Sequence, residues 1–215
     1  MLPFTSEQFF AVFGAYNQAV WPAQVFLLAL AVLALVLVAS PRAWSGWGVS
    51  SILAFLWAWL SLAYHLAFFA AINPLAYVFA AVSAAGAVVF FWQGVVKRNL
   101  RFQLVRSARL VVGVALIAFA LVIYPAWSVY SGHVYPAMPT FGLPCPTTLF
   151  TIGLLAFLAP PYARSPLVVP VLWCLVGAQA AFLLGVWQDL GLLAAAAVGA
   201  VLIARASAPL ARGLP

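Results

Sequence analysis

Long apolar runs separated by short connections dominate this chain and leave few folds open to it. Of its 215 residues, 68% are hydrophobic and 5% are charged, and the mean hydropathy is +1.18. The runs are about 16 to 24 residues long, close to the length that a tilted helix needs to cross a bilayer core of ~30 Å. Because backbone polar groups must be satisfied within lipid, we expect an all-α integral membrane protein, with residues 1–215 forming a single helical bundle domain. Seven transmembrane helices are predicted, over 20–39, 47–70, 74–96, 106–129, 145–159, 166–186 and 190–205.

The charged residues predict the orientation of these helices. Successive connections between spans lie on opposite sides of the membrane, and this places both acids, Glu7 and Asp189, on the same side. The positive-inside rule makes the opposite, cationic side cytoplasmic, so the N-terminus is expected outside and the C-terminus inside. One missed crossing would scatter the cations, and the pattern therefore supports the count of seven. All nine cations share the second side: Arg42, Lys97, Arg98, Arg101, Arg106, Arg109, Arg164, Arg205 and Arg212.

A short amphipathic helix is expected before the first span. Thr5 and Gln8 have the spacing of a capping box, and Phe9 and Phe13 recur at a helical interval. The pattern predicts a helix over Thr5–Gln18 that lies flat on the outer surface, with its aromatic face in the membrane interface.

The fifth run is the least regular of the seven. Its freely apolar part covers only residues 147–159, between the prolines at 144 and 146 and those at 160 and 161. Such a helix would reach about 20 Å, which is short of the bilayer core. A re-entrant element is the alternative to a span. Crossing is favoured because a re-entrant element would leave Arg164 outside.

Side chains that can bind a soft metal gather toward the outer side. Imidazole, thiolate and thioether groups together suit copper, zinc or mercury. Glu7 and Asp189 would form an acidic periplasmic mouth that attracts cations. The candidate metal ligands are His65, His133, Met138 and Cys145.

Other interpretations of these residues stay open. His65 and His133 are the two residues that could serve as axial ligands of a haem. Alternatively, His65 is a hydrogen-bonded core residue, His133 a solvated loop residue and Cys145 a small buried hydrophobe. Their spacing matches no strict metal motif.

Several function classes find little support in the composition. The two acids form no carboxylate pair for acid–base catalysis, so we do not expect an enzyme. No basic, aromatic-laced surface points to nucleic acid. A proton-driven carrier would need an ionisable residue at the middle of the membrane.

Four stretches of the chain resemble an uncharacterised family of bacterial multi-pass inner-membrane proteins, a domain of unknown function. They are PFTSEQFFAVFGAYNQAVWPAQ at 3–24, YHLAFFAAINPLA at 64–76, FFWQG at 90–94 and GHVYPAMPTFGLPCPTTLFTIGLL at 132–155. The resemblance implies a polytopic protein of the bacterial inner membrane, and it implies no activity.

These features of the sequence lead to two alternative hypotheses about function. The first is a small-solute or soft-metal transporter or sensor whose ligand site opens to the periplasm. The second is a non-catalytic accessory subunit of a larger inner-membrane complex, whose partners besides the lipid bilayer are other subunits or a second copy of the chain. A ligand-binding protein should hold His65 and Cys145 within about 10 Å around a polar cavity. An accessory subunit should have a dry interior and a flat apolar flank.

Overall fold

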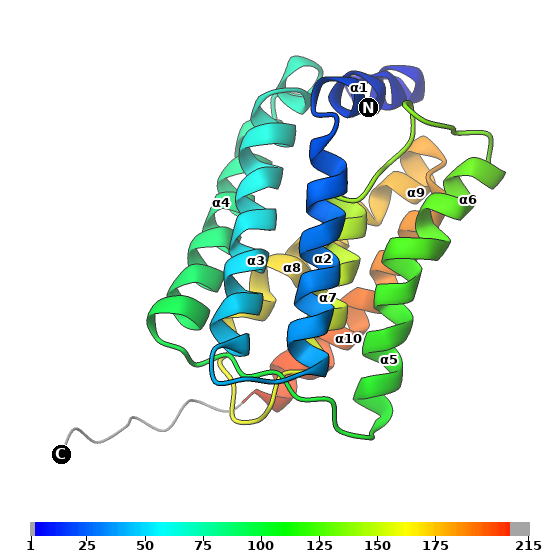
Figure 1. The fold of residues 1–215 in the computed structure, drawn as a ribbon. Coiled ribbons are helices and arrows are strands. Elements are labelled where there is room, and N and C mark those ends of the chain that lie inside the picture. The colour runs from blue at the N-terminus through cyan, green and yellow to red at the C-terminus, as the bar shows by residue number, and fades with distance from the viewer. Residues whose placement is uncertain (1–2, 207–215) are drawn as a thin grey trace.

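The computed structural model describes residues 3–206, which form a bundle of helices without a β-strand in that range (Figure 1). Each of the seven predicted runs contains a helix. Short 3-10 turns are η2 (Phe69–Ala71) and η5 (Trp187–Leu190), and π-helical turns are η1 (Leu60–Leu66), η3 (Phe91–Val96) and η4 (Phe119–Ile123). The α-helices are α1 (Ser6–Ala19), α2 (Ala23–Ala39), α3 (Ser45–Trp59), α4 (Ala76–Phe90), α5 (Ala108–Ala118), α6 (Tyr124–Tyr130), α7 (Pro144–Leu155), α8 (Ser165–Gly177), α9 (Gln179–Leu184) and α10 (Gly191–Arg205).

The prediction of an all-α membrane protein is confirmed. Within the described residues, α1 and α2 are bent by 87° and give a sixth candidate span only if they are taken together, while α7 is a shorter apolar helix. The seven-span count therefore stays a prediction. Five helices are long and apolar enough to cross a membrane: Ser45–Ala71, Ala76–Val96, Ala108–Tyr130, Ser165–Leu184 and Trp187–Arg205.

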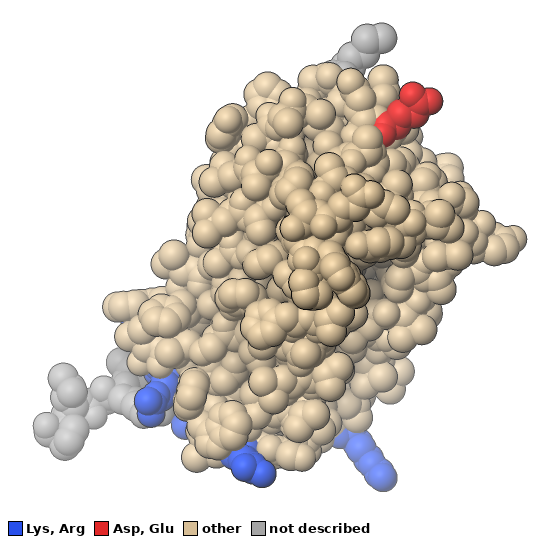
Figure 2. All heavy atoms as spheres, turned by 45° about the horizontal axis from the view of Figure 1, so that its top comes forward, with Lys and Arg blue, Asp and Glu red and all other residues tan. Residues whose placement is uncertain are grey.

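Charge is separated along the bundle as the sequence predicts. Arg212 lies outside the described residues, and the other eight of the nine cations lie in connections or helix ends at the end opposite α1. Figure 2 shows blue side chains at this end and a red one at the other, where α1 carries the exposed Glu7. We call these the cationic end and the α1 end.

Helix α1 begins with the expected capping box. The Thr5 hydroxyl accepts a hydrogen bond from the Gln8 amide at 3.2 Å, and the Gln8 side chain accepts one from the Thr5 amide at 2.9 Å. Pro22 has no amide hydrogen to continue the helix, so the chain turns before α2 begins. As a result, α1 lies across the end of the bundle (Figure 1).

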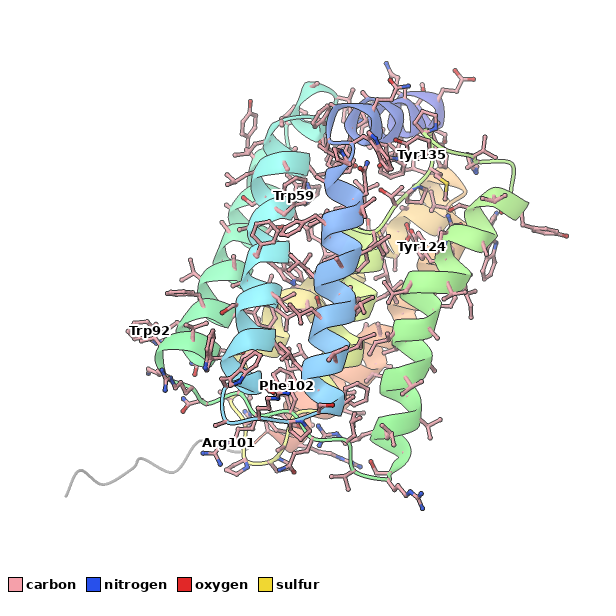
Figure 3. All side chains as sticks on the ribbon, in the orientation of Figure 1. Trp59, Trp92, Arg101, Phe102, Tyr124 and Tyr135 are labelled. Atoms are coloured by element: carbon pink, nitrogen blue, oxygen red, sulfur yellow. The ribbon has the colours of Figure 1, made fainter. Side chains whose placement is uncertain are left out.

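The aromatic face of α1 packs on the protein itself. Phe9, Phe13 and Tyr16 are buried, and the ring of Tyr16 makes an edge contact with Tyr64, 5.6 Å between centroids. Trp59 donates to the Tyr16 hydroxyl at 2.7 Å, on the α1 side of the bundle (Figure 3). The expectation that this face lies in the membrane interface is wrong, because other helices cover it.

Asn17 fastens the connection that precedes α7. Its side-chain amide donates to the carbonyls of Pro136 and Met138, at 2.6 and 2.8 Å. Its side-chain oxygen accepts a hydrogen bond from Thr140 at 2.7 Å, and its backbone carbonyl accepts one from Gln24 at 2.8 Å. One fully buried residue thus joins the bend between α1 and α2 to the non-helical segment 132–143.

Helix α7 is the buried centre of the bundle. Its 12 residues are all buried except Cys145, which is half-buried, and they reach only about 18 Å. It approaches α5 closely, because a Cβ on Gly113 would lie 2.8 Å from the Gly153 carbonyl oxygen. Small residues of this kind let helix backbones meet in membranes. The fifth run is therefore helical, and whether it crosses the membrane stays a prediction.

The cationic end secures the chain that leaves α7. Arg109 donates to the carbonyls of Ala156 and Leu158, at 3.0 and 2.8 Å. Phe102 forms an isolated antiparallel bridge with Leu158; Figure 3 shows Phe102 and Arg101 at this end. The Arg109 cation thus satisfies carbonyls that the helix end leaves free, and it also complements the negative end of the helix dipole.

Replacing Asn17 tests how much of the fold depends on this residue. We expect Asn17→Leu to destabilise the protein by about 2–4 kcal/mol, because buried carbonyls and the Thr140 hydroxyl lose their partner. The melting temperature should fall by roughly 5–12 °C for a chain of this size. The control is Asn99→Leu, which removes a partly buried side chain with a single amide contact to Gln93. Equal melting temperatures for the two variants would contradict the fastening role of Asn17.

Candidate functional site

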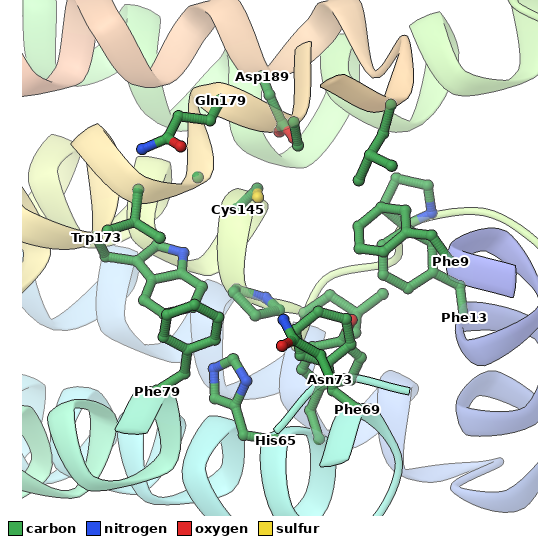
Figure 4. A pocket seen from close by; sticks show the side chains of 18 of the residues that line it. Phe9, Phe13, His65, Phe69, Asn73, Phe79, Cys145, Trp173, Gln179 and Asp189 are labelled. Carbon is green, nitrogen blue, oxygen red and sulfur yellow. The ribbon is translucent and has the colours of Figure 1, made fainter. Parts of the chain in front are cut away.

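A cavity of about 190 Å³ lies at the α1 end, between α1, η1, the first turn of α7, α8, α9 and η5 (Figure 4). Segments that are far apart in the sequence therefore build it together. We call it the outer cavity.

One wall of the outer cavity is aromatic. Phe4, Phe9 and Phe13 come from the N-terminal segment and Phe69 from η2, whereas Phe79 of α4 packs on His65 and Trp173 on the other side of the cavity (Figure 4). The rings pack edge to face, with 4.6 Å between the centroids of Phe9 and Phe13 and 5.6 Å between those of Phe4 and Phe69. Such contacts add to the burial energy and hold the rings in place.

The opposite wall carries polar atoms that have no partner. His65 is 1% exposed and Trp173 is 6% exposed, with 5.0 Å between their ring centroids. Both nitrogen atoms of the His65 ring lack a hydrogen-bond partner, and so does the indole nitrogen of Trp173. An unsatisfied buried polar group costs about 1–3 kcal/mol, so such a group calls for a physical reason. His65 lies in the π-helical turn η1, a distortion that is frequent at functional sites.

A second polar group lies where α7 begins. Asp189 is 1% exposed, and the Tyr124 hydroxyl donates a hydrogen bond to its carboxyl group. The Cys145 thiol lies close to both groups, and Figure 4 shows Cys145 and Asp189 on the same side of the cavity. The amino end of α7 carries the positive end of the helix dipole, which favours an acidic group there. Tyr124, Cys145 and Asp189 thus form a corner of the outer cavity in which the acid already has partners; we call it the acidic corner.

A glycine keeps the space between the two polar sets open. A Cβ on Gly177 would lie 3.4 Å from the Cys145 sulfur and also 3.4 Å from the Trp173 indole nitrogen. Any larger residue at 177 would insert a side chain between the acidic corner and Trp173.

The structure brings together only some of the predicted site residues. His65, Cys145 and Asp189 all line the outer cavity, whereas His133, Met138 and Glu7 do not. His133 instead stacks on Phe10, 3.7 Å between ring centroids. His65 and His133 therefore share no cavity for a haem. Met138 is buried and its carbonyl accepts from Asn17.

The acidic mouth stays a prediction: Asp189 is buried in the wall of the outer cavity, and Glu7 is exposed on α1. Within residues 3–206, no group of three or more His, Cys, Asp and Glu side chains is placed to hold a metal ion. The soft-metal site therefore remains a prediction without a formed ligand set in this part of the chain.

Two residues of the site had no clear signal in the sequence. Trp173 and Tyr124 are ordinary members of apolar runs, and only the packing reveals that they face the outer cavity. Asp189 did carry a signal, since an acid beside apolar helices is costly and usually has a partner.

Comparison with known proteins identifies the family of the chain but no function. Residues 6–211 match a family of unknown function, DUF6064. The chain belongs to this family. Neither the curated proteins nor the solved structures give a match. The DUF6064 match agrees with the resemblance to an uncharacterised family.

A substitution at His65 tests whether its ring is unpaired. We expect His65→Leu to raise stability by about 1 kcal/mol, because it removes a buried polar ring that lacks a partner. The melting temperature should then rise by about 2–4 °C. Tyr124→Phe is the matched contrast and should lower it, since Asp189 loses its donor. A lower melting temperature for His65→Leu would show that the ring has a stabilising partner.

Proposed function

We propose that this DUF6064 protein binds a small organic molecule in its outer cavity, as a transporter or sensor of the bacterial inner membrane. The observation that carries the proposal is an aromatic cavity whose polar wall holds unpaired, buried nitrogen atoms. Ligand sites are typically apolar with a few well-placed polar groups.

The size of the outer cavity suits a ligand built on one ring. An engineered cavity of about 150 Å³ lined by apolar side chains binds benzene. A cavity of about 190 Å³ therefore offers room for one ring with a small substituent. The accessory-subunit alternative expects a dry interior and a flat apolar flank, and it gives no reason for a cavity whose wall holds unpaired polar atoms.

The proposal places the outer cavity on the periplasmic side. The cations at the opposite end support this orientation by the positive-inside rule. In this orientation the α1 end, which includes the N-terminal segment, lies at the periplasmic surface of the membrane.

Cysteine labelling tests the orientation. In a background with Cys145→Ala and Cys174→Ala, single cysteines replace Glu7 and Arg101, which are both exposed. A membrane-impermeant maleimide should label Glu7→Cys in spheroplasts and Arg101→Cys only after lysis. The reverse pattern would invert the protein in the membrane.

Thermal unfolding of the detergent-purified protein tests ligand binding. The probes are acetophenone and α-methylstyrene, two one-ring compounds of nearly equal shape. At ten times its dissociation constant, a probe should stabilise the protein by about 1.4 kcal/mol, or roughly 3–6 °C.

A filled cavity provides the control for unspecific effects on the micelle. Ala180 lines the outer cavity and is half-buried, so Ala180→Phe should block the space and abolish the shift. Absence of a shift with both probes, or an equal shift in the blocked variant, would count against a ligand site and favour the accessory subunit.

A further inference from the structure

We propose that the outer cavity selects an uncharged ring compound that carries a carbonyl oxygen, with the Trp173 indole and His65 as the groups that recognise this oxygen. The inference rests on the proposed function and specifies its ligand class.

Trp173 determines the type of polar atom that the ligand must present. An indole nitrogen can only donate a hydrogen bond. This one is buried, unpaired and directed into the outer cavity (Figure 4). A ligand that satisfies it must therefore offer an acceptor at this place.

His65 adds a second donor beside the first. A neutral imidazole has one nitrogen that donates and one that accepts, and both are free here. The two rings lie 5.0 Å apart between centroids and both line the outer cavity, so a ligand that meets the indole donor also lies near the His65 ring. A carbonyl oxygen has two lone pairs and suits this arrangement.

The acidic corner would favour an organic cation over an uncharged carbonyl compound, because the carboxylate and the aromatic rings could hold a cation. Asp189 already accepts from Tyr124 and lies beside the Cys145 thiol at the amino end of α7. The unpaired groups are thus at the His65–Trp173 wall and not at the acid. This difference favours the acceptor-bearing ligand over the cation.

The mouth of the outer cavity agrees with an uncharged ligand. Lining residues that reach the surface are mainly apolar, with Leu75 57% exposed, Leu183 55% and Val176 39%. Transfer of a charged group past such a rim is costly, whereas an apolar ring gains from it.

The test compares three probes of similar size by their dissociation constants, after correction for partitioning into micelles. They are acetophenone, which has the carbonyl, α-methylstyrene, which replaces it with a methylene group, and 1-phenylethylamine, which carries a cation. Acetophenone should bind about fivefold to tenfold more tightly than α-methylstyrene, the gain expected for one or two neutral hydrogen bonds.

Trp173→Phe should remove most of this preference and keep the binding of α-methylstyrene, because the ring remains and only the donor is lost. Trp187→Phe is the matched control and should leave the ratio unchanged, since Trp187 is exposed and does not line the outer cavity. Melting temperatures without ligand show that both variants are folded.

Four results would overturn the inference. Equal binding of acetophenone and α-methylstyrene would show that the hydrogen-bond donors do not recognise the ligand and that the site is purely apolar. An unchanged ratio of the two dissociation constants in Trp173→Phe would show the same. Tightest binding of 1-phenylethylamine would assign recognition to Asp189. If none of the probes binds, the proposed function fails together with the ligand class.

Discussion

The structure depends on the need to satisfy the backbone on both sides of α7, a helix too short to span a bilayer alone. Peptide groups at membrane depth that face lipid without a partner are prohibitively costly. Asn17 supplies hydrogen bonds to the segment that enters α7, and Arg109 supplies them to the segment that leaves it. The surrounding helices bury α7 almost completely. One central half-length helix with a polar fastening at each end thus organises the bundle.

The same arrangement accounts for the outer cavity. Since α7 begins inside the bundle and segment 132–143 leads into it from the α1 end (Figure 1), no continuous helix fills the space above its first turn. The broken path α8–α9–η5 borders this space from the other side. Helix α1 turns across it and contributes the aromatic wall. In discontinuous membrane helices, ligand sites are commonly found where helix ends meet a cavity.

Hydropathy and charge predicted the large-scale features, because they act along whole segments. They placed a helix in each run, the capped helix α1 and the separation of cations from Glu7. They could not predict which way α1 would turn its aromatic face, since lipid and protein are equally apolar partners for Phe9 and Phe13. Of the four candidate metal ligands, His65 and Cys145 do line one cavity. His133 and Met138 were grouped with them by chemistry alone, and the fold separates them. Trp173 became visible only in three dimensions, where its buried, unpaired indole nitrogen distinguishes it from Trp57 and Trp59, whose nitrogens donate to Thr151 and Tyr16.

The aromatic wall has a consequence for comparing members of the family. Most of that wall comes from one continuous stretch at the start of the described chain, and α1 is joined to the bundle by a sharp bend and not by a continued helix. The polar wall lies on other elements, α3–η1 and α8. Exchange of residues 3–19 between two DUF6064 proteins would therefore replace most of the aromatic wall in a single chimera and leave the polar wall intact. Under the proposed function, preference for ring shape and preference for the polar substituent would then be inherited separately.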